Sequence, residues 1–234
     1  MSATDAAARR EELVALYKEV SKCTKCPLHE TRTKTVFGAG NADADLMFVG
    51  EAPGAEEDRQ GLPFVGRAGQ LLNELLVEIG LSREDVFICN VLKSRPPNNR
   101  DPQPTEIAAC EPYLFEQVRL IQPRVVCTLG NFATKLLTGN PTGITRVRGN
   151  PQTHELGGRT VHLLPLFHPA AALRTPAVKE QLRGDFATIP ALIQQALPEP
   201  MPSASEIAAE MATEDEDPPP PADQLGFFGG ADTG

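Results

Sequence analysis

Apolar and polar residues follow one another in blocks along this 234-residue chain. Four short blocks are apolar at successive positions, without the alternation of a half-exposed strand, which is typical of strands buried on both faces of a sheet. They span residues 45–50, 86–92, 124–129 and 160–166. Between the first two blocks, leucines and an isoleucine recur at helical spacing over residues 66–80, and Gly80 gives a stop signal.

The segments around the other apolar blocks predict further helices. They span residues 7–21, 105–121 and 131–138, the second with Thr105 as its N-cap. The proline-rich stretch 95–104 must form a loop, because proline lacks the N–H donor that strands and helices use. Strands that alternate with helices predict an α/β fold whose parallel sheet is covered by helices.

The segments that leave the four proposed strands begin near residues 50, 90, 130 and 167. In open α/β sheets, ligands bind beyond the carboxyl ends of the strands. Glycine and proline in these segments could simply mark turns. Three of the four segments also carry polar side chains capable of chemistry, so we expect a functional site there.

The net charge of −9 is unevenly distributed. Nine of the 31 acidic residues, and no basic residue, lie after Leu197, so residues 1–197 hold equal numbers of acidic and basic side chains. Residues 198–234 are rich in Pro, Ala and Glu with little to bury, which predicts a disordered acidic tail behind a folded domain of residues 1–197. The neutral folded part is compatible with a polyanionic partner.

The sequence has no apolar run of the roughly 18–20 residues that a membrane span needs. Its first residues form an amphipathic pattern rather than the apolar core of a secretory signal. We therefore expect a cytoplasmic protein without membrane partners, and a monomer. In that compartment, its five cysteines are expected to be metal ligands, core thiols or reactive thiols rather than disulfides.

Cys23 and Cys26 form a CxxC motif, which is compatible with a zinc site, a redox pair or iron–sulfur ligands. The absence of a second CxxC disfavours a zinc ribbon. The position of the Cys23–Cys26 motif after a helix disfavours a thioredoxin-like redox pair. With Cys110 and one more thiolate, the pair could hold a [4Fe–4S] cluster. Cys89 and Cys127 also fit as core thiols on buried strands.

Positive charge gathers in two loops near the expected site. Such side chains are commonly solvated, but their placement also predicts contacts with the phosphates of a nucleic-acid backbone. The residues are Lys93, Arg95, Arg100, Arg146 and Arg148.

Several segments together resemble the family 4 uracil-DNA glycosylases, the bacterial and archaeal type that carries an iron–sulfur cluster. The matching motifs are GEAPG at 50–54 with ED at 57–58, GLPFVG at 61–66, NV at 90–91, RPPNNR at 95–100 and FHPA at 167–170. The resemblance extends from about Tyr17 to Leu197. It implies a three-layer α/β/α sandwich with a central, mainly parallel four-stranded sheet, and hydrolytic removal of uracil from DNA.

The resemblance also implies a uracil-binding pocket, since an enzyme acting on a base must flip it out of the duplex. Phe64 would stack on the uracil ring, and the Asn90 amide would pair with O4 and N3–H. Glu57 would form the wall that excludes the methyl group of thymine. Ala52, also expected against the substrate, stands where better-known relatives carry a water-holding Asp.

For the reaction itself, the resemblance points to three residues. His168 would donate to uracil O2 and stabilise the departing anion. Asn99 would position the attacking water, and Glu51 would contact the flipped nucleotide or polarise the site. Without a strong base, we expect the reaction to depend on stabilisation of the leaving group and on the field of the DNA polyanion.

In this family the cluster ligands match Cys23, Cys26 and Cys110, but Ser94 stands where the family usually has its remaining cysteine. Cys89 could substitute, the cluster could have an unusual fourth ligand, or it could be lost. Cys89 and Asn90 should point to opposite faces of their strand, which allows Asn90 to face uracil and Cys89 a cluster behind the sheet.

The tail motif Gln224–Phe228 resembles the peptide by which bacterial repair proteins dock on the sliding clamp, although so short a pattern also arises by chance. A flexible linker would raise the effective concentration of the enzyme near replicating DNA.

Two other functions would also fit parts of the sequence. One is a protein on the same scaffold that traps uracil-DNA without turnover, which Ala52 and a proline-rich loop without histidine disfavour. The other is a redox or structural cluster protein, which leaves Phe64, Asn90 and His168 unexplained. No lysine stands at a strand end in a Schiff-base position, so hydrolysis is favoured over imine chemistry.

Overall fold

The central sheet of this computed structural model, which describes residues 3–197, has six strands in the order β1-β3-β2-β4-β6-β5. The four inner strands are parallel and coincide with the four apolar blocks. They are β2 (Leu46–Gly50), β3 (Phe87–Asn90), β4 (Val125–Leu129) and β6 (Arg159–Leu166). Their shared direction brings their carboxyl ends to one edge of the sheet.

Two antiparallel edge strands were not expected from the sequence. β1 (Ala39–Gly40) has two residues, too few for a hydrophobic pattern. β5 (Gln152–Leu156) is largely polar and half-exposed, and it pairs with β6 through a turn at Gly157 and Gly158, both at positive φ. Edge strands with one face in solvent lack the apolar run that identifies the inner strands.

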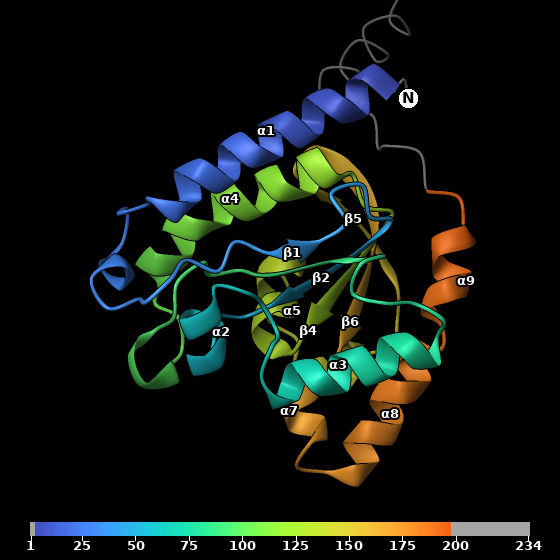
Figure 1. The fold of residues 1–234 in the computed structure, drawn as a ribbon. Coiled ribbons are helices and arrows are strands. Elements are labelled where there is room, and N and C mark those ends of the chain that lie inside the picture. Colours follow the sequence, from blue (N-terminus) through green and yellow to red (C-terminus); the bar gives the residue numbers. More distant parts are fainter. Residues whose placement is uncertain (1–2, 198–234) are drawn as a thin grey trace, which may run out of the picture. The chain divides into compact units, whose positions relative to one another are not determined.

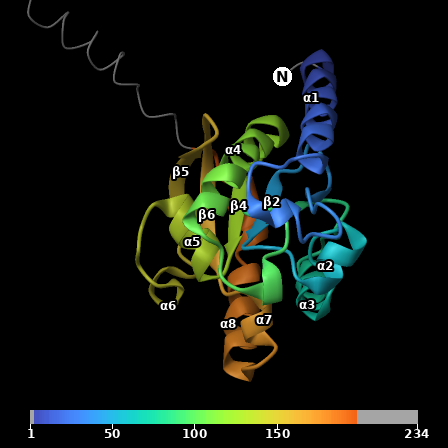
Figure 2. The ribbon, with the colours of Figure 1, turned by 90° about the vertical axis from the view of Figure 1, so that its left-hand side faces the viewer.

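Helices cover both faces of the sheet (Figures 1 and 2). α1 (Ala3–Ser21), α4 (Pro104–Ile121) and α5 (Asn131–Thr138) pack on the face that carries Met47, Val49 and Val126. α3 (Arg67–Glu78), α7 (Pro169–Ala172), α8 (Pro176–Phe186) and α9 (Ile189–Gln194) pack on the face that carries Phe48 and Cys127. This is the three-layer α/β/α arrangement.

The start of α4 differs from the prediction. Gln103, not Thr105, is its N-cap, and Pro104 occupies the first helical position, where its missing N–H is no loss. The Glu106 carboxylate accepts the Gln103 backbone N–H at 2.9 Å. Thr105 is therefore inside the first turn.

Short helices complete the fold: α2 (Ala55–Gln60), α6 (Ile144–Val147) and the 3₁₀ turns η1 (Pro27–His29) and η2 (Pro97–Asn99). Within residues 3–197, none of the helices combines the length and apolar character of a membrane span. The tail motif Gln224–Phe228 lies outside the described residues.

Candidate active site

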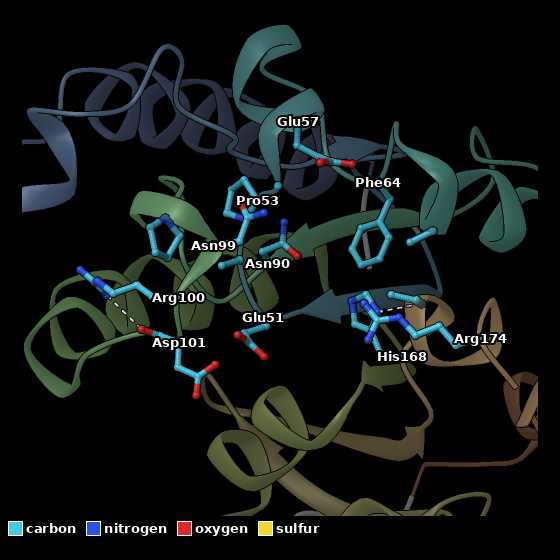
Figure 3. A pocket seen from close by; sticks show the side chains of 15 residues that line it. Glu51, Pro53, Glu57, Phe64, Asn90, Asn99, Arg100, Asp101, His168 and Arg174 are labelled. Carbon is cyan, nitrogen blue, oxygen red and sulfur yellow. Dashed lines mark hydrogen bonds between the residues drawn. The ribbon is translucent and has the colours of Figure 1, made fainter.

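A cavity of about 640 Å³ opens at the carboxyl ends of β2, β3 and β6. Figure 3 shows the side chains that line it. Phe64, Asn90 and His168, which lie far apart in the sequence, all face this strand-end cavity. Among the other predicted site residues, it is lined by Glu51, Ala52, Glu57, Asn99 and Arg100. A ring, an amide and an imidazole therefore converge in one space.

Phe64 is held in the cavity by its loop. Its backbone adopts φ +51°, a strained conformation for a residue other than glycine. Glu57 fixes the following turn by accepting the N–H groups of Val65 and Gly66 at 3.0 and 2.9 Å. Arg83 donates to the carbonyl oxygens of Pro63 and Phe64 at 2.6 and 2.9 Å. The ring is thus placed before any ligand arrives.

Asn90 and Phe64 meet over Gly50, the last residue of β2. A Cβ at residue 50 would lie 2.4 Å from Asn90 Oδ1 and 2.7 Å from Phe64 Cζ. Only glycine allows this close approach. On the adjacent position of β3, Cys89 belongs to the apolar cluster of the opposite sheet face, so the two side chains do point in opposite directions.

His168 follows β6 and caps α7. Its Nδ1 accepts the Ala170 backbone N–H at 3.1 Å, so Nδ1 carries no proton. Burial lowers the pKa of His168 to about 4, despite the opposing charge of Glu57. At neutral pH the imidazole is therefore uncharged, with its one proton on Nε2. The ring stacks near Phe64, with centroids 5.7 Å apart.

Two carboxylates, Glu51 and Asp101, line the cavity below the amide and the ring in Figure 3. Glu51 is half-buried. Burial, and secondarily the charge of Asp101, raise the pKa of Glu51. An anionic Glu51 carboxylate in this position suits a cation that develops beside it.

The proline-rich loop is anchored by an ion pair between Arg100 and the fully buried Glu106, with contacts of 2.6 and 2.9 Å. Arg100 also donates to the Asp101 carbonyl oxygen at 2.9 Å. Asn99 stands in the left-handed region at φ +53°, and its Oδ1 accepts from Arg95 Nε at 2.8 Å. The loop therefore presents Asn99 and Asp101 from a fixed base.

The prediction that Lys93 contacts a DNA backbone is wrong. Lys93 is 2% exposed, and its ammonium donates to the Asn90 carbonyl oxygen at 2.7 Å and to Gln117 Oε1 at 2.6 Å. Arg148 is largely occupied by Asp185, with contacts of 2.5 and 2.9 Å, and lies over the Phe167 ring. Arg146 is exposed and suits a surface contact.

Three residues important for the cavity were not identified from the sequence. Asp101 and Arg174 line it, and Arg83 holds the Phe64 loop from outside. Asp101 could have been noticed because it directly follows the RPPNNR motif. Arg83 donates to backbone carbonyl groups from the charged loop before β3, and no sequence motif marks this role.

Cys23, Cys26 and Cys110, which we call the cysteine pocket, lie near one another: both thiols of the CxxC motif interact electrostatically with Cys110. No three His, Cys, Asp or Glu side chains in residues 3–197 are grouped closely enough to hold a single metal ion. A four-iron cluster binds each thiolate to a different iron and so needs a wider spacing. The three thiols fit such a cluster by their chemistry.

Comparison with known proteins agrees with this geometry. Residues 37–187 match the model of the Uracil DNA glycosylase superfamily. The chain is 47% identical over 183 residues to the type-4 uracil-DNA glycosylase of Archaeoglobus fulgidus, covering 76% of this chain and 92% of that protein. It is 54% identical over 167 residues to the type-4 enzyme of Thermotoga maritima, covering 70% and 85%. The chain therefore belongs to the uracil-DNA glycosylase superfamily and, within it, to the type-4 uracil-DNA glycosylases.

Proposed function

We propose that the chain excises uracil from DNA as a repair glycosylase, hydrolysing the N-glycosidic bond and leaving an abasic site. The observation that carries the proposal is the convergence of Phe64, Asn90 and His168 on one cavity. A flat ring, an amide and a neutral imidazole match the face, the O4/N3 edge and the O2 atom of a flipped uracil.

Selection of uracil would come from the Asn90 amide and the walls around it. Uracil offers an acceptor at O4 and a donor at N3, which the amide can pair with together. Cytosine reverses this pattern and would leave the buried amide unpaired, which strongly disfavours its binding. The Phe64 loop, fixed by Glu57, would leave no room for the methyl group of thymine.

Bond cleavage produces a uracil anion and a cationic sugar. The Nε2–H of His168 would donate to O2 as negative charge develops there. Burial keeps this donor neutral, and the Ala170 N–H bonded to Nδ1 keeps its proton on Nε2. Glu51 would stabilise the cationic sugar. Asn99 would orient a water molecule that attacks C1′ and loses its proton to solvent, while the base leaves with the bonding electron pair.

The DNA strand would be held by exposed cations around the cavity. Arg174 on its lining and Arg146 on the short helix α6 are exposed and could reach phosphates. Arg95 and Arg100 would chiefly shape the proline-rich loop, because Arg95 bonds to Asn99 and Arg100 ties the loop to Glu106 of α4.

We further propose that the cysteine pocket holds a [4Fe–4S] cluster, with Cys23, Cys26 and Cys110 as three of its ligands. When bound, the cluster would fasten the N-terminal segment to α4 and to the loop after β3. That loop continues into Asn99 and Arg100, so the pocket would stabilise one wall of the strand-end cavity without taking part in hydrolysis.

The full chain should be incubated with duplexes that contain a single U·G, U·A, T·A or C·G pair. We expect free uracil and an alkali-labile abasic site from the two uracil duplexes only. Intact oligonucleotide in all four reactions would contradict the proposal. A denaturant-stable adduct of the chain with uracil-DNA would instead establish a trapping protein.

A further inference from the structure

The segment between Cys23 and Val36 is held by contacts at two places, and both places adjoin the cysteine pocket. At the first, Lys25 lies over the Tyr113 ring, 4.5 Å from its centroid, and Glu19 accepts from Tyr113 Oη at 3.0 Å and from Lys25 Nζ at 3.3 Å. Tyr113 and Cys110 are buried on the same face of α4, one turn apart. The CxxC motif therefore faces Cys110.

At the second place, the same segment meets the loop after β3. Val36 N–H donates to the Lys93 carbonyl oxygen at 2.8 Å, and Arg32 Nη1 donates to Ser94 Oγ at 3.2 Å. Arg32 also interacts electrostatically with Cys26. Ser94 is 4% exposed, so its hydroxyl is inside the protein, bonded to a guanidinium that interacts electrostatically with this thiol.

Backbone N–H groups surround the three thiols. Lys25 N–H faces Cys23 Sγ at 3.5 Å, and the N–H groups of Leu28 and Lys93 bond to the sulfurs of Cys26 and Cys110. Donors of this kind stabilise thiolate ligands of iron–sulfur clusters. The N–H that serves Cys110 belongs to the residue directly before Ser94, which places Ser94 beside this ligand as well.

Cys89 has a different environment. It is fully buried on β3, and its thiol contacts the Lys93 ammonium. That ammonium is fixed by Asn90 and Gln117. To join the other thiols, Cys89 would have to displace a buried cation from two hydrogen bonds. Ser94 instead accepts a hydrogen bond from Arg32 and directly follows the residue whose N–H bonds to Cys110.

We propose that Ser94 supplies the fourth ligand of the cluster, so that three irons are bound by thiolates and one by the Ser94 oxygen. The inference rests on the proposed cluster and names a ligand for this chain. On binding, the hydroxyl loses its proton to solvent and an iron–oxygen bond forms, with no change in oxidation state. Arg32, which donates to Ser94 Oγ, stabilises the resulting alkoxide.

An oxygen ligand is harder than a thiolate and favours the more oxidised iron, so it lowers the reduction potential of the cluster. The test compares the full-length wild type with Ser94→Cys, Ser94→Ala and Cys89→Ala, all purified without oxygen. Iron content, reduction potential and the EPR spectrum are measured, and circular dichroism verifies folding. Ser82→Ala, a surface serine far from the pocket, is the matched control.

We expect about four irons per chain in the wild type, Ser94→Cys, Cys89→Ala and Ser82→Ala. Ser94→Cys should have a higher reduction potential than the wild type. Ser94→Ala should lose one iron as Fe²⁺ and, after oxidation of the purified protein with ferricyanide, should give the EPR signal of an oxidised three-iron cluster. Four irons and an unchanged potential in Ser94→Ala, or loss of the cluster in Cys89→Ala, would overturn the Ser94 assignment.

Different results would remove the cluster and its serine ligand. Wild-type protein that releases uracil but contains no iron after anaerobic purification would remove the cluster itself. Iron-loaded protein that behaves identically with serine or alanine at residue 94 would remove only the serine ligand. In both cases the proposed roles of Phe64, Asn90 and His168 would be unaffected.

Discussion

The strand-end cavity and the cysteine pocket are built in different ways. The cavity gathers side chains from the ends of three strands, and close backbone approaches at Gly50 and a strained Phe64 fix their positions. The pocket gathers its thiols from one loop and one turn of α4. The contacts of Lys25 with Tyr113 and of Arg32 with Ser94 hold this loop in place. The cavity therefore depends on the sheet, and the pocket on how the N-terminal segment packs.

One short stretch of chain connects the two regions. Asn90 faces the cavity, the Lys93 backbone N–H bonds to Cys110 of the pocket, Ser94 bonds to Arg32, and Asn99 returns to the cavity. Damage to the cavity should abolish chemistry without affecting iron, whereas damage to the pocket should reach the chemistry only through this loop. The following changes test that separation.

His168→Ala should have the largest effect. Removing a donor to the leaving group typically costs about 10²–10³ in rate. Single-turnover uracil release from a U·G duplex measures the loss, and iron content should stay unchanged. His154→Ala, on the edge strand β5, is the control and should release uracil at the wild-type rate. A reduction of less than about threefold in His168→Ala would show that the leaving group is stabilised elsewhere.

Gly50→Ala should be the next most damaging change. The added methyl group would overlap Asn90 Oδ1 and the Phe64 ring, which must then shift. A misplacement of about 1 Å at such a site can cost about 10²-fold in rate. Gly184→Ala, where a Cβ meets nothing within 4 Å, is the matched control and should retain full activity. Equal rates for the two variants would mean that the close packing is not required.

Asp101→Asn should change the pH dependence of kcat/KM. The charge of Asp101 is the smaller of two causes that raise the pKa of Glu51, after burial. The ionised form of Glu51 is the one proposed to act, so activity falls as pH drops through its pKa. Without the Asp101 charge that pKa decreases, and the acid limb of the profile should move to lower pH. Glu84→Gln, an exposed carboxylate on a distant loop, should leave the limb in place, and an unmoved limb in Asp101→Asn would disprove the coupling.

Lys93→Met and Arg146→Ala should have small effects on two different properties. The first should lower stability, and the second should weaken the salt dependence of DNA binding. Lys93→Met leaves Asn90 O and Gln117 Oε1 without their donor and should cost about 1–3 kcal/mol of stability in urea unfolding. Its DNA affinity should keep the wild-type salt dependence. Arg146→Ala should keep stability but lower the salt slope by about one, as expected for one lost phosphate contact. A lower salt slope in Lys93→Met would contradict the burial of this lysine.

The contrast between regions also explains what the sequence could predict. The inner strands and their carboxyl ends were recognisable because their residues are apolar on both faces, and this placed Asn90 and His168 at one edge. The short strand β1 and the half-exposed β5 carry no such signal. A lysine in a proline-rich loop reads as solvated, and only the packing of Gln117 from α4 makes Lys93 an internal residue.

The most direct test of the proposed site is release of free uracil by Asn90→Ala under single-turnover conditions, beside the wild type and with unfolding midpoints for both. The account predicts a wild type that releases uracil from a U·G duplex and a variant that is folded, still contains iron and is slower by about 10²-fold or more. A folded variant that releases uracil at the wild-type rate would show that the amide at the end of β3 does not bind the base.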